Sequence, residues 1–77
     1  MKTNMYALFD SAAKTFLQPM YVLNDGIAIR AIMDIVNSEE KNNVNQHPEQ
    51  FTLFHIGSWD DNNGKVESID SVAKHYV

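Results

Sequence analysis

The chain has 77 residues, enough for one domain, and its 44% hydrophobic and 21% charged residues are typical of a globular rather than a disordered protein. It contains no cysteine, which excludes disulfides and thiolate zinc sites, so a domain this small must gain its stability from its core or from oligomerisation. The net charge of −4, with six basic residues and no basic run, argues against tight unspecific binding to phosphate backbones.

The first predicted element is a strand over residues 5–10, a short apolar segment with two aromatic residues that ends at Asp10 before a turn. Residues 16–23 also favour extended structure. Pro19 lacks the amide that a ladder hydrogen bond needs, so this second segment is predicted to be an edge strand or an extended connection.

A helix is predicted from Asp25 to Asn37, because Asn24 can cap its first amides and the carboxylate of Asp25 suits the positive end of the helix dipole. Helical spacing predicts one buried face, made of Ala28, Ala31, Ile32, Ile35 and Val36. The apolar residues off that face are Ile27, Ile29 and Met33. We expect a long loop or a second subunit to cover this flank, with Ile29 and Met33 as the predicted oligomer interface.

The second half of the chain predicts a loop and a hairpin. Residues 38–50 are polar and rich in turn-forming residues, which predicts an exposed loop. Residues 51–59 are aromatic and β-branched and predict the strongest strand, at the centre of the sheet. Turn residues 60–64 lead into the alternating stretch 65–69, which predicts a hairpin. Residues 71–77 lack a clear period and are expected to form a short helical or disordered tail.

Together these elements predict a single α+β domain over residues 1–77. It has a small antiparallel sheet of about four strands, in the order β-β-α-β-β, with one helix packed on it. The amino-terminal residues lack the apolar region of a signal peptide, and no apolar run approaches the roughly 18 residues of a membrane span. We therefore expect a cytoplasmic protein that does not contact a membrane.

Several short motifs occur in one collinear order. They are FDSAAK at 9–14, LQP at 17–19, the helix start with Asn24, Asp25, Ala28 and Arg30, HPE at 47–49 with Phe51, Leu53 and Phe54 after it, and DDNNGK at 60–65. In combination these motifs resemble the small nonstructural protein of gokushovirus-type Microviridae, which are tailless single-stranded-DNA phages.

The resemblance implies a nonstructural phage product that is made in the cytoplasm of the bacterial host and left out of the mature virion. It implies DNA binding in the switch from duplex replication to single-stranded genome synthesis and packaging. The alternative is a homo-oligomeric adaptor that contacts replication or capsid-assembly proteins, of the phage or the host, without touching DNA.

The predicted nucleic-acid-binding residues are Lys14, Arg30, Tyr21 and Trp59. The two basic residues lie inside the motifs, and the aromatic side chains, with Phe16, can provide stacking surfaces for exposed bases. Other roles stay open, because Arg30 can instead pair with Asp34 or Asp25, and the aromatic residues can fill the core.

No metal site is predicted. The three histidines, His47, His55 and His75, lack the spacing that brings imidazoles onto one zinc ion. On the strongest strand, His55 is expected to be a hydrogen-bonded structural histidine. Asp60, Asn62 and Gly64 resemble part of a calcium loop, but the loop's glycine and bidentate glutamate are missing, so we expect a hairpin turn.

Catalytic motifs are also missing from the sequence. It has no nucleophile elbow, no phosphate-binding glycine loop and no cysteine, and a domain this small rarely encloses an active-site pocket. We therefore expect no enzyme, no catalytic residues and no cofactor.

Overall fold

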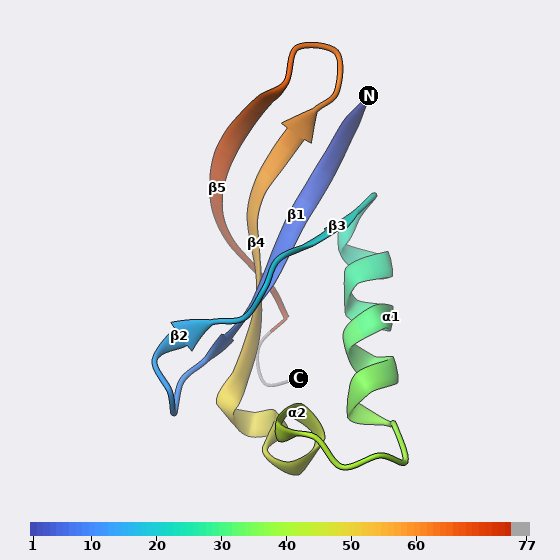
Figure 1. The fold of residues 1–77 in the computed structure, drawn as a ribbon, viewed down its shortest axis with the longest axis vertical. Helices are drawn as coiled ribbons and strands as arrows, with labels where there is room; N and C mark the ends of the chain where they lie inside the picture. Colours follow the sequence, from blue (N-terminus) through green and yellow to red (C-terminus); the bar gives the residue numbers. More distant parts are fainter. Residues whose placement is uncertain (75–77) are drawn as a thin grey trace.

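A five-stranded antiparallel sheet carries the main helix on one of its faces (Figure 1), in a computed structural model that describes residues 1–74. The strands are β1 (Lys2–Asp10), β2 (Thr15–Phe16), β3 (Met20–Val22), β4 (Phe51–Asp60) and β5 (Lys65–Lys74). The helices are α1 (Asp25–Val36), the short α2 (Asn43–Gln46) and the 3₁₀ turn η1 (Pro48–Gln50). The predicted α+β class is confirmed, with five strands in place of four.

The two longest pairings place β1 and β4 at the centre of the sheet. They run antiparallel from the Lys2 and Asp60 pair to the Asp10 and Phe51 pair, and β5 lies on the far side of β4. The short strands β2 and β3 share the other edge of β1. Pro19 falls between them, where the lack of an amide costs no ladder bond, so the predicted edge segment is confirmed as two short strands.

The limits of α1 follow from its capping residues. The side chain of Asn24 accepts a hydrogen bond from the amide of Ile27 at 3.0 Å, and Asn37 ends the helix as its C-cap. Ala28 and Ile32 are fully buried as predicted, but Ile35 is 39% exposed. The buried stripe is rotated toward Ile29, which packs against the core, so the prediction that Ile29 lies off the buried face was wrong.

The hydrophobic core lies between α1 and the sheet face that it covers, which we call the inner face. Its buried members are Tyr6, Leu8, Ala28, Ile32, Val44, Phe51 and Leu53. Because successive strand residues point to opposite faces, Tyr6 and Leu8 on β1 meet Leu53 on β4 over the same side of the sheet. Within residues 1–74, the hydrophobic core is this single layer between helix and sheet.

The segment 38–50 is more ordered than its polar composition predicts. In α2, Asn42 and Asn45 form a reciprocal capping box in which each side chain accepts from the other's amide at 2.9 Å. This turn carries Val44 into the core, where it is 7% exposed. The prediction of an exposed loop was therefore wrong at Val44, because one apolar residue among polar neighbours anchors the segment against the core.

The expected tail was also wrong for residues 71–74, which continue β5 as far as Lys74. Register shifts in the pairing of β4 with β5, between Leu53 and Phe54 and between His55 and Gly57, interrupt the two-residue alternation that identifies a strand. Residues 75–77 lie outside the described part of the chain. Within residues 1–74, no helix is long and apolar enough to cross a bilayer.

A candidate nucleic-acid-binding groove

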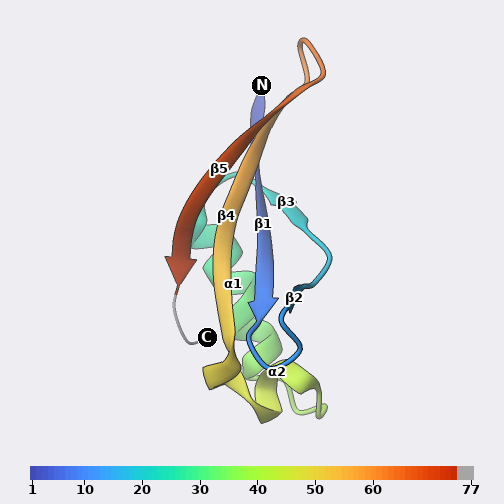
Figure 2. The same ribbon diagram turned by 90° about the vertical axis from the view of Figure 1, so that its left-hand side faces the viewer.

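The face of the sheet that turns away from α1, which we call the outer face, is largely uncovered. Figure 2 looks onto this face, with α1 behind the strands. Several of its side chains are large and apolar and stay exposed: Tyr21 by 60%, Val66 by 59%, Phe16 by 51% and Trp59 by 36%. Exposed apolar patches of this kind mark interaction surfaces in small soluble proteins.

A groove of about 480 Å³ lies on the outer face, lined by Thr3, Met5, Tyr21, Trp59 and Val66. Its floor is β1, which contributes Thr3 and Met5. On β3, Tyr21 stands opposite Met5 and forms one wall. On β4, Trp59 stands opposite Thr3, with Val66 of β5 beside it, and forms the other wall. The sheet register thus brings together aromatic residues from two strands that are far apart in the sequence.

Gly57 keeps the floor of the groove open beside Met5, its partner on β1. A Cβ atom at this position would lie 3.6 Å from the sulfur of Met5 and only 2.8 Å from the carbonyl oxygen of Glu67. Because that oxygen belongs to the backbone of β5, a side chain here would force the two strands apart. Glycine therefore both permits the close approach of β5 and leaves the floor free of a side chain.

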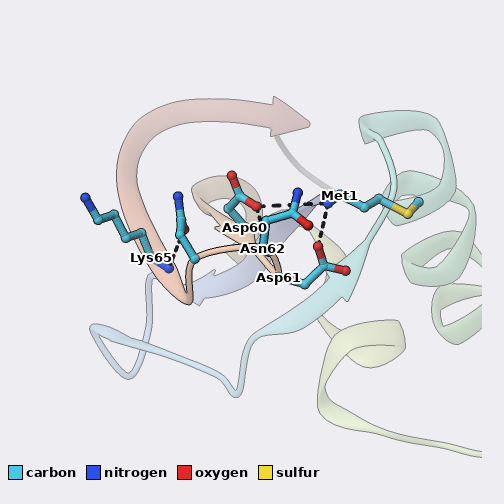
Figure 3. Close-up of polar contacts among 6 residues, drawn as sticks. Met1, Asp60, Asp61, Asn62 and Lys65 are labelled. Carbon is cyan, nitrogen blue, oxygen red and sulfur yellow. Dashed lines mark hydrogen bonds and ion pairs between the residues drawn. The ribbon is translucent and has the colours of Figure 1, made fainter.

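The groove carries no charged side chain, and its polar side-chain groups are the hydroxyls of Thr3 and Tyr21 and the indole N–H of Trp59. None of these three groups forms a hydrogen bond with any of residues 1–74, so all remain available to a ligand. Two cations directly precede groove residues, Lys2 before Thr3 in β1 and Lys65 before Val66 in β5, but neither lines the groove. In Figure 3 the side chain of Lys65 extends away from the acidic turn, and it makes no ion pair within the described chain.

The acidic turn beside the groove is a hairpin turn, as predicted. Asp60 accepts a hydrogen bond from the amide of Asn62 at 2.9 Å, and Gly64 adopts a positive φ of 71°. The ammonium group of Met1 contacts Asp61 at 2.5 Å and Asp60 at 4.0 Å (Figure 3). The hydrogen bond to Asp61 raises the pKa of this amine. The two carboxylates thus bind an amide of the turn and the amine of Met1, which precedes β1.

Behind the groove, His55 belongs to a polar network on the inner face. Its ring stacks on Tyr6 with centroids 4.7 Å apart, and its Nε2 atom lies 3.1 Å from Oδ1 of Asn4. The hydroxyl of Tyr6 donates to Asp25 at the start of α1. Burial, reinforced by the bond to Asp25, raises the pKa of Tyr6 well above its usual value. The expected structural role of His55 is confirmed.

The other two histidines do not join His55. His47 lies between α2 and η1, as the residue before Pro48, and His75 lies outside the described residues. Among residues 1–74, no three metal-ligating side chains come close enough to hold an ion.

The predicted nucleic-acid-binding residues are divided among three places. Tyr21 and Trp59 face each other across the groove. Lys14 lies in the turn between β1 and β2, at the opposite end of β1 from Thr3, with a positive φ of 57°. Arg30 is on the exposed side of α1, behind the sheet, and forms no ion pair with any of residues 1–74. The two aromatic residues are brought together, and the two cations are not.

Sequence reasoning missed Thr3, Met5 and Val66 as parts of the site. Starting the first strand at residue 5 left Thr3 out of it, although Thr3 and Met5 alternate with the buried Tyr6 and Leu8. Val66 could have been found from the predicted hairpin, because a turn over residues 60–64 puts residue 66 opposite Trp59.

The other half of the outer face holds a cluster of three phenylalanines, Phe9, Phe16 and Phe54. The ring of Phe16 lies 4.9 Å from that of Phe9 and 5.6 Å from that of Phe54. This Phe cluster is only partly covered, since Phe16 is half exposed and the neighbouring Val72 is 38% exposed. By comparison, the predicted interface residues Ile29 and Met33 on α1 are half-buried.

Comparison with known proteins places this site in a phage protein. No curated protein and no solved structure gave a match to the chain. Residues 3–76 match the family model described as Phage ORF5 protein, and the match covers every residue of the groove and all five strands except Lys2 at the start of β1. The chain therefore belongs to the Phage ORF5 protein family.

Proposed function

We propose that this phage protein binds single-stranded DNA through the groove on its outer face, in the switch from duplex replication to single-stranded genome synthesis and packaging. The role is one of binding without catalysis. The observation that carries the proposal is the meeting of Tyr21 and Trp59, exposed aromatic residues from distant segments, at the two walls of one neutral groove.

Stacking is the interaction that this arrangement favours. Contact between a base and an aromatic side chain contributes about 1–3 kcal/mol per base. The bases of a duplex are stacked on one another and expose only their edges, so rings that stand on a sheet face can reach bases of a single strand but not those of a duplex. The groove therefore favours single-stranded over duplex DNA.

Charge limits the strength of this binding. The net charge of −4 repels a phosphate backbone, and the groove itself carries no cation. None of the six basic side chains forms an ion pair within residues 1–74. The ion pairs found there are made by the terminal amine. The basic side chains remain free to meet phosphates, which gives an affinity that is weak and falls modestly with salt.

Titration of the protein with single-stranded and duplex DNA, from about 50 to about 200 mM salt, tests the proposal. We expect binding to the single strand only. Tyr21→Ala should weaken it by about 5-fold or more, as loss of one stacked base predicts. Leu23→Ala is the matched control, since Leu23 is 51% exposed near the same edge but does not line the groove. Absence of binding to both DNA forms would refute the proposal.

A second candidate is the homo-oligomeric adaptor, and the observation that favours it is the Phe cluster. A partly uncovered group of phenylalanines can pack against its own copy despite the net charge of −4. Phe16→Glu should then dissociate the oligomer without unfolding the domain, because Phe16 is half exposed. Met33→Glu tests the predicted interface on α1 in the same way. A strictly monomeric mass at micromolar concentration would exclude this candidate.

A further inference from the structure

We propose that the groove selects one unpaired thymine base from the strand that it binds. The selection rests on the proposed function, because it concerns the same site, and it adds the chemical identity of the base. The groove residues supply two features that bear on this identity: an apolar lining, and a few polar groups of which more donate than accept hydrogen bonds.

The width of the groove suits one planar base. Its walls stand on β3 and β4, which are separated by β1, so two strand spacings of about 4.8 Å each divide the aromatic residues. The volume of about 480 Å³ is within the range of small-ligand pockets. A base that enters over Met5 can contact the ring of Tyr21 or that of Trp59 while its sugar stays in solvent.

The polarity of the lining disfavours bases with exocyclic amino groups. Adenine, cytosine and guanine each carry such a group, and a donor that is buried without an acceptor costs about 1–3 kcal/mol. The side chains of the groove offer three donors, the hydroxyls of Thr3 and Tyr21 and the indole N–H of Trp59, but only the two hydroxyls as acceptors. Thymine has no amino group: it brings one donor, its N3–H, and two carbonyl oxygens that can accept from these donors, which matches the lining better than a base with a two-donor amino group.

The methyl group of thymine provides a contact that the other bases cannot make. Val66, the thioether of Met5 and the methyl group of Thr3 line the groove together and form an apolar surface. Burying one methyl group is worth about 0.8 kcal/mol, which corresponds to a three- to fivefold difference in affinity. Uracil differs from thymine in this group alone, so comparison of the two bases isolates the contact.

Trp59 is the only tryptophan of the chain, so its fluorescence reports directly on the groove. The experiment titrates the full chain with single strands of about eight nucleotides, composed of deoxythymidine, deoxyuridine, deoxycytidine or deoxyadenosine. We expect quenching of Trp59, with the thymine strand bound about three to five times more tightly than the uracil strand. Val66→Ser should reduce this ratio to near one. Val72→Ser, on the same strand but outside the groove, should preserve it.

The outcomes separate this inference from the proposed function. Equal affinity for the thymine and uracil strands, or tighter binding of the adenine strand, would overturn the thymine assignment while DNA binding stands. Absence of binding to every strand would overturn the proposed function as well. Emission of Trp59 that changes on dilution without DNA would mean that a second copy of the chain occupies the groove, and would also overturn the assignment.

Discussion

The two faces of the sheet use the same strands for different purposes. On the inner face, Tyr6 and Leu53 are fully buried beneath α1. On the outer face, Tyr21 and Val66 are each more than half exposed. Both faces are apolar, so hydrophobic composition does not distinguish them. The difference teaches that the helix decides which face stabilises the domain, and leaves the other available for binding.

The unequal cover follows from the size of the chain. A sheet needs one packed layer to form a core, and α1 with α2 supplies this layer for the inner face only. In so short a chain, no segment within residues 1–74 packs over the groove. Apolar side chains that stay in water add nothing to folding, so their gathering at the groove calls for a role in recognition.

The largest difference between the faces should appear when equivalent aliphatic side chains are truncated. Leu53→Ala on the inner face should cost about 2–5 kcal/mol, because it leaves a cavity in the core. Val66→Ala on the outer face should change stability by less than about 0.5 kcal/mol. Urea denaturation followed by circular dichroism measures both. Similar losses would mean that the outer face is covered in solution.

Gly57 tests a position at which the outer face constrains the fold. Gly57→Ala should destabilise the domain by about 1–3 kcal/mol, because its Cβ would overlap the backbone of β5. Gly26→Ala, in the first turn of α1, is the matched control. Its Cβ would meet only ordinary contacts, and alanine favours a helix, so we expect a gain of up to about 1 kcal/mol. If thermal unfolding shows the same sign for both variants, the close approach of β5 is not limiting.

Tyr6 on the inner face and Tyr21 on the outer face allow the contribution of a tyrosine hydroxyl to stability to be compared between the two faces. Tyr6→Phe removes the hydrogen bond to Asp25 and should lower the free energy of unfolding by about 1.5 kcal/mol. This value is at the low end of the range for hydrogen bonds to charged groups, because Asp25 is exposed and regains contact with water. Tyr21→Phe should leave stability unchanged, since its hydroxyl has no partner within residues 1–74. The midpoint of urea unfolding measures both changes. An equal loss in the two variants would contradict the contrast between the faces.

The raised pKa of Tyr6 predicts a smaller effect, a loss of folding stability at alkaline pH. In the unfolded chain a tyrosine ionises near pH 10, below the pKa of Tyr6 in the folded protein. Stability from this group is therefore complete below about pH 10, and falls above it by at most about 1.4 kcal/mol per pH unit. The difference in the free energy of unfolding between wild type and Tyr6→Phe should therefore shrink by about 1.4 kcal/mol between pH 9 and pH 11. A constant difference would mean that Tyr6 keeps an ordinary pKa.

Local rules were enough to predict the elements whose patterns are regular. The cap at Asn24 and the apolar spacing after it placed α1 within one residue of each end, and the aromatic run placed β4 at the centre of the sheet. The end of β5 could not be predicted, because its register shifts remove the alternation. Val44 was missed for a different reason, since only tertiary packing makes one valine in a polar segment an anchor.

The site was predicted only in part, for a related reason. Stacking chemistry identifies Tyr21 and Trp59 from the sequence, but strand register alone places them over Met5 in one groove. The separation of Arg30 from this groove depends on which face α1 covers, and residue spacing within one segment does not contain that information.

The most direct test of the outer face as the binding surface is to map amide chemical shifts while a short thymine strand is added to the isotopically labelled protein. We predict that the perturbed amides centre on Thr3, Met5, Tyr21, Trp59 and Val66, with little change in α1. Perturbations centred on Lys14 or Arg30, with the groove unaffected, would contradict the account.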